Sequence, residues 1–233
     1  MPRPTAVLFD FDGVIADSER LHHQTMVEVM GETGPETPWS FYRENLMGMD
    51  DRAAFAFLLK RSGVAATPEA VREKMAQKAV LFARYAAEGR VPVFPGAVRL
   101  IRSCMGRVPL GLCSGAVKSD IDPIVSALGL DEAFAVRITA EDVPQSKPHP
   151  ASYQLCVEAL AALFPQRDIR PGTCLAIEDS PDGIASAHAA GVPVLAVATN
   201  CTQEELRATP AFASVPSLDD MILESLQILV SDT

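Results

Sequence analysis

Short apolar runs alternate with longer stretches of helical periodicity over much of the chain. The runs have the length of strands buried on both faces, and they lie at residues 5–10, 108–113, 134–139, 173–178 and 193–198. Helical periodicity fills the intervals at 97–105, 119–128, 150–163 and 181–190. This alternation predicts an α/β fold with a doubly wound, parallel sheet. The tail at 217–230 predicts a short strand remnant and an amphipathic helix.

A different pattern separates the first two strands. There the apolar positions follow a helical period, with no strong strand. Thr67 and Pro68 are suited to the N-cap and the first position of one of these helices. We therefore expect a helical insert at residues 17–91 within a catalytic core formed by 1–16 and 92–233.

Two carboxylates follow the first predicted strand. We expect Asp10 to point into a site at the carboxyl end of this strand and Asp12 to lie on the turn that Gly13 permits. Taken alone, such a pair is more often an acidic turn without chemistry. Two neighbouring acids repel unless a cation or a shared proton offsets the repulsion. Mg²⁺ would do so, and would leave one carboxylate as nucleophile and the other as acid/base.

Further polar groups follow later strands or lie in loops. They are Ser114-Gly115, Lys147-Pro148 and Glu178-Asp179. Together with the two N-terminal acids, their order and spacing resemble the four motifs of the haloacid dehalogenase superfamily. Members of that superfamily mostly transfer phosphoryl groups through an aspartyl-phosphate. The resemblance implies a core of the same fold.

The resemblance also implies a role for each motif residue. Asp10 would attack phosphorus, and Asp12 would protonate the leaving oxygen and then activate water. Lys147 would offset the negative charge of the nucleophile and the phosphate. Ser114 and Gly115 would bind phosphate oxygens.

Magnesium is the cofactor that the resemblance implies. Asp10, Asp12 and Asp179 would serve as its ligands. Glu178 is either a fourth ligand or a residue that orients the others. Asp182, in contrast, is better explained as a charge at a helix N-terminus.

The position of the insert resembles the helical-cap subclass, which includes β-phosphoglucomutase, phosphoglycolate phosphatase and the CbbY-type phosphatases. Positions that match the mutase and CbbY members, and thereby imply substrate binding, are Ser18, His22, Gly48, Arg52 and Lys78. Taken alone, Arg52 and Lys78 are more often solvated charges on helix faces. We also expect Asp50 and Asp51 to be able to pair with Arg52 and to weaken its claim on a phosphate.

The favoured function is a magnesium-dependent phosphatase acting on a small phosphorylated sugar or related metabolite. A sugar phosphomutase of the β-phosphoglucomutase type is the alternative. The stretch Ala116-Val117-Lys118 is less polar than in the mutase, which favours the phosphatase. A metabolite-binding module without catalysis is a third possibility, although a binder has no need of so many clustered charges.

Composition narrows the range of partners and compartments. The net charge of −10, with no basic run, argues against nucleic-acid and anionic-membrane partners. Five scattered cysteines without CxxC spacing favour reduced thiols in a cytoplasmic protein. No apolar stretch approaches the roughly 20 residues that span a bilayer. The first strand begins too early to leave room for a signal peptide. We expect the protein to be a monomer.

Overall fold

The computed structural model describes residues 3–32, 34–47, 49 and 51–226. The chain divides into two compact units. The first, here called the core unit, comprises Met1–Asp17 and Pro92–Thr233, and the second, the helical unit, comprises Ser18–Val91.

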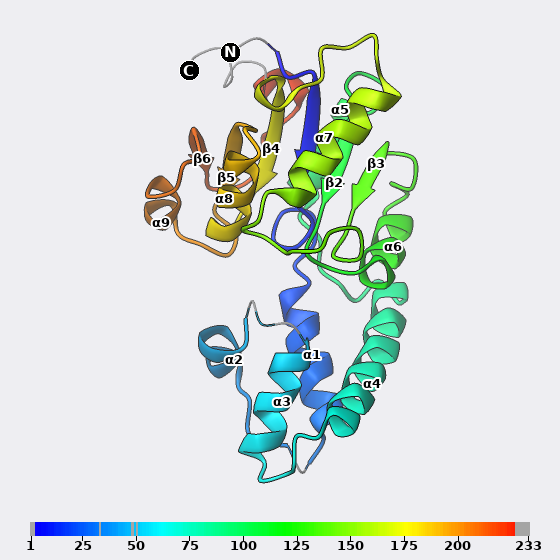
Figure 1. Cartoon of the computed structure of the whole chain (residues 1–233), viewed down its shortest axis with the longest axis vertical. Helices are drawn as coiled ribbons and strands as arrows, with labels where there is room; N and C mark the ends of the chain where they lie inside the picture. The colour runs from blue at the N-terminus through cyan, green and yellow to red at the C-terminus, as the bar shows by residue number, and fades with distance from the viewer. Residues whose placement is uncertain (1–2, 33, 48, 50, 227–233) are drawn as a thin grey trace. The chain divides into compact units, whose positions relative to one another are not determined.

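A parallel sheet forms the centre of the core unit (Figure 1). Among the described residues it has six strands in the order β3-β2-β1-β4-β5-β6. The strands are β1 (Ala6–Phe9), β2 (Leu110–Cys113), β3 (Val136–Ile138), β4 (Cys174–Glu178), β5 (Val194–Val197) and β6 (Ala213–Val215). The predicted parallel α/β fold is therefore confirmed, and β1 lies between β2 and β4.

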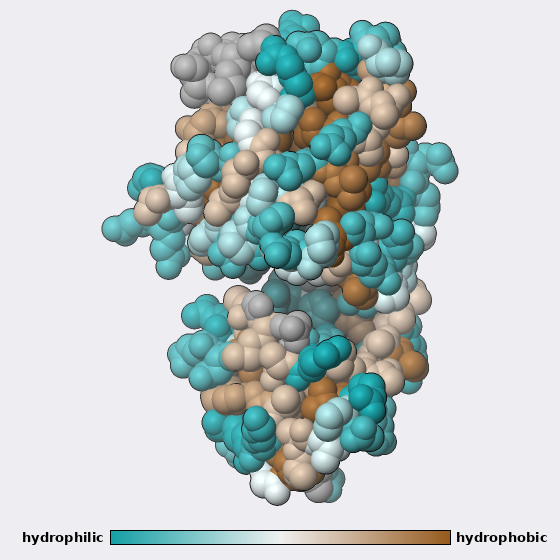
Figure 2. Space-filling model, viewed as in Figure 1, coloured by the Kyte–Doolittle hydropathy of each residue, from teal (hydrophilic) through white to brown (hydrophobic). Residues whose placement is uncertain are grey.

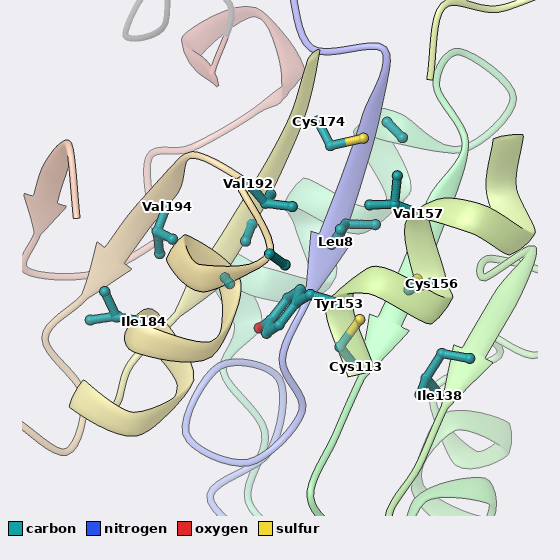
Figure 3. Close-up of a cluster of buried hydrophobic side chains, with 14 of the residues drawn as sticks. Leu8, Cys113, Ile138, Tyr153, Cys156, Val157, Cys174, Ile184, Val192 and Val194 are labelled. Atoms are coloured by element: carbon teal, nitrogen blue, oxygen red, sulfur yellow. The ribbon is translucent and has the colours of Figure 1, made fainter. Parts of the chain in front are cut away.

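Helices cover both faces of this sheet. They are α5 (Pro95–Cys104), α6 (Lys118–Ala127), α7 (Ala151–Leu163), α8 (Pro181–Ala189) and α9 (Gln203–Arg207), with a 3₁₀ turn at Pro171–Thr173. Successive strand residues point to opposite faces. Ala6 and Leu8 thus belong to one apolar cluster with residues of α7 and α8. Figure 3 shows Leu8 in this cluster with Tyr153 and Val157 of α7 and Ile184 of α8.

The last part of the core unit differs from the sequence prediction. The strand remnant expected after residue 217 is not found among residues 217–226, the part of the tail that the structure describes, and the sixth strand lies upstream at Ala213–Val215. Its three residues are only partly buried, so they form no strong apolar run. The sequence analysis also missed helix α9. Thr202 and Glu205 form its capping box, and this pattern is a sequence signature of a helix N-terminus.

The helical unit consists of α1 (Glu19–Met30), α2 (Trp39–Asn45), α3 (Asp51–Arg61) and α4 (Pro68–Ala87). Its apolar core includes Met26, Tyr42 and Phe55. The predicted N-cap is confirmed, since the Thr67 side chain accepts a hydrogen bond from the Ala70 amide at 3.2 Å. Helix α2 is short, and the sequence pattern did not reveal it.

The two connections to the insert are paired with each other inside the core unit. The Asp17 amide donates to the Pro92 carbonyl at 2.8 Å, and the Phe94 amide donates to the Ile15 carbonyl at 2.9 Å. Ala16 forms an antiparallel bridge with Val93. The chain therefore leaves and rejoins the core unit through one hydrogen-bonded stem.

The visible surface mixes hydrophilic and hydrophobic residues (Figure 2). Exposed apolar side chains include Val80, at 74% exposure, and Leu163, at 58%. Scattered residues of this kind are common on globular proteins. Within the described parts of the chain, no helix is both long enough and apolar enough to cross a bilayer.

Candidate active site

Three of the predicted site residues of the core unit follow three neighbouring strands. Asp10 comes directly after β1, Ser114 directly after β2, and Asp179 directly after β4. The Asp10 amide still donates to the Ile177 carbonyl at 3.0 Å, so the sheet pairing continues into the site. Because parallel strands end at one edge, residues far apart in the sequence meet there.

Three acids meet at this edge. Asp10, Glu178 and Asp179 each offer one carboxylate oxygen, and these oxygens lie within 4.8 Å of one another. The three residues are 6%, 0% and 3% exposed. A buried set of carboxylate oxygens suits a hard cation such as Mg²⁺.

Lys147 binds two of these acids. Its ammonium donates to Asp10 Oδ1 at 2.5 Å, to Glu178 Oε1 at 2.6 Å and to the Cys113 carbonyl at 2.9 Å. Burial by itself would lower the pKa of Lys147, but the carboxylates of Asp10 and Glu178 raise the pKa above its ordinary value. Lys147 is therefore a fixed positive charge beside the predicted nucleophile.

Glu178 is occupied by hydrogen bonds on both oxygens. Besides Lys147, Oε1 accepts from the Tyr153 hydroxyl at 2.8 Å. Oε2 accepts from the Asp179 amide at 3.1 Å and from Ser180 Oγ at 3.2 Å. These bonds suit a residue that orients Lys147 and Asp179. Tyr153 was missed by the sequence analysis, although a buried tyrosine hydroxyl requires a partner.

Asp12 lies on the predicted turn, which Gly13 forms with φ +81°. The Asp12 carboxylate is outside the group of three acids, and the Ser114 hydroxyl donates to its Oδ2 at 3.5 Å. Ser114 Oγ also accepts from the Ala116 amide at 2.9 Å, and Gly115 is exposed. The acid predicted for proton transfer is thus close to the predicted phosphate-binding serine.

Burial and mutual repulsion raise the pKa values of two of the three acids. Burial, followed by repulsion from Glu178, raises the pKa of Asp10 well above its ordinary value, although Lys147 opposes the change. The same two causes raise the pKa of Asp179 to about 7. A bound divalent cation favours the ionised forms of both carboxylates.

The family model for haloacid dehalogenase-like hydrolases matches residues 4–191 of this chain. The chain belongs to this family. As a haloacid dehalogenase-like hydrolase it is an enzyme, and the predicted recognition is confirmed.

Two curated relatives and two solved structures define the similarity further. CbbY of Rhodobacter capsulatus is 28% identical over 204 residues, which cover 85% of this chain and 87% of the relative. Hexitol phosphatase B of Escherichia coli (strain K12) is 25% identical over 223 residues, or 95% and 96% of the two chains. The solved structures, below 25% identity, show the fold alone.

One of these structures is CbbY from Rhodobacter sphaeroides in complex with xylulose-(1,5)bisphosphate, with TM-score 0.80, 24% identity and coverage of 96% and 99%. The other is a β-phosphoglucomutase from Thermotoga maritima, described as putative in its source, with TM-score 0.72, 23% identity and coverage of 100% of both chains. The comparisons together support the CbbY/β-phosphoglucomutase-like subclass of haloacid dehalogenase-like hydrolases.

A further strand of this hydrolase contributes residues that the sequence analysis missed. Asn200 Nδ2 donates to Asp179 Oδ2 at 2.7 Å, and Thr199 Oγ1 donates to the Gly13 carbonyl at 2.6 Å. Both residues follow β5, which pairs with β4. Polar residues directly after a buried strand were the available signal.

Within the helical unit, Lys78 is a buried cation. Its side chain is 4% exposed, and its ammonium lies 2.5 Å from Asp51 Oδ1 and 2.9 Å from His22 Nδ1. Since an ammonium only donates, His22 Nδ1 is the acceptor and the imidazole is neutral. Burial and the charge of Lys78 lower the pKa of His22 well below its ordinary value, in agreement with this state.

The expected pairing of Asp51 with Arg52 is wrong, because Asp51 pairs with Lys78. Successive residues of a helix point in directions about 100° apart, so Asp51 and Arg52 occupy different faces of α3. Arg52 is exposed in the first turn of α3, and Ser18 is buried immediately before α1. Gly48 and Asp50 lie outside the described residues.

Proposed function

We propose that this hydrolase is a magnesium-dependent phosphatase of a small phosphorylated sugar or related metabolite, acting through an aspartyl-phosphate on Asp10. The observation that carries the proposal is the Lys147 ammonium, which donates to Asp10 at 2.5 Å and to Glu178 at 2.6 Å, two of the three clustered acids. The hexitol phosphatase and the CbbY bound to a sugar bisphosphate support the same substrate class.

The oxygen donors described above fit Mg²⁺. We propose Asp10 and Asp179 as its carboxylate ligands, with Glu178 as the residue that orients them. Asp12 was also predicted as a ligand; because its carboxylate is not part of the group of three acids, we propose proton transfer as its role instead. When bound, Mg²⁺ supplies positive charge that stabilises the transferring phosphoryl group.

We propose Asp10 as the nucleophile. Lys147 holds Oδ1, and the structure records no hydrogen bond from a described residue to Oδ2. In the proposed first step, Oδ2 attacks phosphorus, the P–O bond of the ester breaks, and Asp12 gives its proton to the leaving oxygen. In the second step, Asp12 removes a proton from water, which attacks phosphorus and frees Asp10. Ser114 and Gly115 would bind phosphate oxygens.

We further propose that the helical unit is the cap that selects the substrate. Ser18, His22, Gly48, Arg52 and Lys78 remain its proposed substrate-binding residues. Because Asp51 compensates the charge of Lys78, Arg52 is the better candidate for an anionic group. A mutase must hold a second phosphate, which requires positive charge in the cap. Because the charge of Lys78 is already compensated, the cap favours a phosphatase.

Product analysis tests the proposed function. The purified protein is incubated with Mg²⁺ and a panel of sugar phosphates, with and without a sugar bisphosphate as primer. We expect release of inorganic phosphate that needs no primer, because water is the acceptor of the phosphoryl group. Formation of a sugar-phosphate isomer that depends on the primer would instead establish the mutase. Absence of turnover on the whole panel would favour the binding module.

Magnesium is expected to stabilise the protein. At about 100 times its Kd, a ligand of the folded state adds about 2.7 kcal/mol, which raises the Tm of a chain of this size by roughly 5 to 10 °C. The measurement is thermal unfolding with MgCl₂ and with EDTA. Asp179→Asn should lose most of the shift. The control Asp182→Asn, an exposed acid in the first turn of α8, should keep it. Equal shifts in both variants would contradict the proposed ligand.

A further inference from the structure

We propose that Asn200 is a positioning residue that holds one oxygen of Asp179 and leaves the other oxygen for the cation. This inference rests on the proposed metal-dependent function. Strand β5 pairs with β4 through Glu178 and Ala196, so the chain after β5 arrives beside Asp179. There the Asn200 amide group donates to Asp179 Oδ2 at 2.7 Å.

Thr199 has a different partner from Asn200. Its hydroxyl carries one hydrogen, and the Gly13 carbonyl at 2.6 Å is a better acceptor than Asp179 Oδ2 at 3.3 Å. Thr199 thus fixes the loop after β5 to the turn that carries Asp12. Asn200 is left as the principal side-chain donor to Asp179 among the described residues.

The space around Gly13 shows how close these groups are. A Cβ atom on Gly13 would overlap Asp179 Oδ2 and would lie 2.5 Å from Asn200 Nδ2. The turn, the carboxylate and the amide are therefore in direct contact. A displacement of Asn200 would change the position of the proposed metal ligand and of the turn next to the proposed acid/base.

The loop does not need the Asn200 side chain for its own structure. The Ala198 amide donates to the Val215 carbonyl at 2.9 Å, and the Thr199 amide donates to the Val197 carbonyl at 3.1 Å. On the other side, the capping box of Thr202 and Glu205 begins α9. The backbone and the capping box hold the loop, so the amide side chain serves Asp179.

The chemistry of a neutral amide fits this position. A hydrogen bond on Oδ2 fixes the rotation of the carboxylate, while Asp179 Oδ1 accepts no recorded hydrogen bond from a described residue. An amide donates without cancelling the negative charge that attracts a cation, whereas a lysine would compete with the cation. Partners of this kind typically change metal affinity or activity by 10- to 100-fold when they are removed.

The test compares Asn200→Ala and Asn200→Leu with wild type and with Gln166→Ala, an exposed amide outside the site. Leucine has nearly the shape of asparagine but no donor, and thus separates loss of the hydrogen bond from loss of volume. Mg²⁺ binding is measured by titration calorimetry without substrate, and folding by circular dichroism. We expect both Asn200 variants to fold and to bind Mg²⁺ about 10- to 100-fold more weakly.

Steady-state kinetics provide the second readout. If Asn200 acts through the metal, the variants need more Mg²⁺ for half-maximal rate, while the KM for substrate changes less than about twofold and Gln166→Ala behaves as wild type. Unchanged Mg²⁺ affinity in either folded variant would overturn the inference. The calorimetric titration contains no substrate, so it tests the role of Asn200 separately from the proposed function. A wild-type protein that binds Mg²⁺ but hydrolyses no phosphate ester would refute the proposed function. The Mg²⁺ affinities of the variants would still decide the role of Asn200.

Discussion

Replacement of Asp10 by asparagine is expected to lower kcat by on the order of 10⁴-fold. Asparagine retains the shape of the side chain and an acceptor for Lys147, but it has no second carboxylate oxygen to form the bond to phosphorus. The measurement is phosphate release with the best substrate of the panel at saturating Mg²⁺.

The interpretation of that loss depends on the fold being retained. Asp10→Asn should stay folded, because Lys147 still pairs with Glu178 and one negative charge leaves a crowded group. Circular dichroism checks this point, and Asp182→Asn serves as the control with unchanged activity. Turnover of Asp10→Asn near the wild-type rate would end the assignment of the nucleophile.

Replacement of Lys147 by methionine is expected to damage both stability and activity. The change leaves Asp10 and Glu178 as buried like charges without their cation, which typically costs about 3 to 5 kcal/mol. We expect kcat to fall by about 10²- to 10³-fold as well, because a fixed positive charge beside the phosphoryl group is lost. Urea unfolding without Mg²⁺ measures the loss of stability, and phosphate release measures the fall in kcat.

A second substitution separates these two effects. In Lys147→Met with Glu178→Gln, one of the uncompensated charges is removed, so part of the stability should return while the activity does not. Lys118→Met is the matched control, because Lys118 is 55% exposed and its ion pair with Asp142 is long, at 3.8 Å. Exposed pairs contribute about 0 to 1 kcal/mol. A similar loss for Lys118→Met and Lys147→Met would contradict the argument from burial.

The sequence allowed three site residues to be placed at the ends of strands, but it did not reveal most of their side-chain partners. Asp10, Ser114 and Asp179 follow continuous apolar runs, and such runs are typical of parallel strands that end at one edge. The position of a residue after a buried strand is a local property. It can therefore be obtained from the sequence without knowledge of the tertiary packing.

The partners depend on packing between distant segments. Tyr153 reaches Glu178 from α7, and Asn200 reaches Asp179 from the loop after β5. The pairing of Asp51 with Lys78 also joins two helices, α3 and α4, and replaced the expected local pair. Hydrogen-bond partners of this kind follow from the packing of whole elements, which a short motif does not encode.

The stem formed by Asp17 with Pro92 and by Ile15 with Phe94 has an evolutionary consequence. An insertion that starts and finishes at adjacent, mutually bonded backbone positions can be lengthened, shortened or exchanged as one block. The sheet register then stays intact, and the charged edge keeps its arrangement. Diversification of the inserted block and preservation of the reaction centre can thus proceed independently in this lineage.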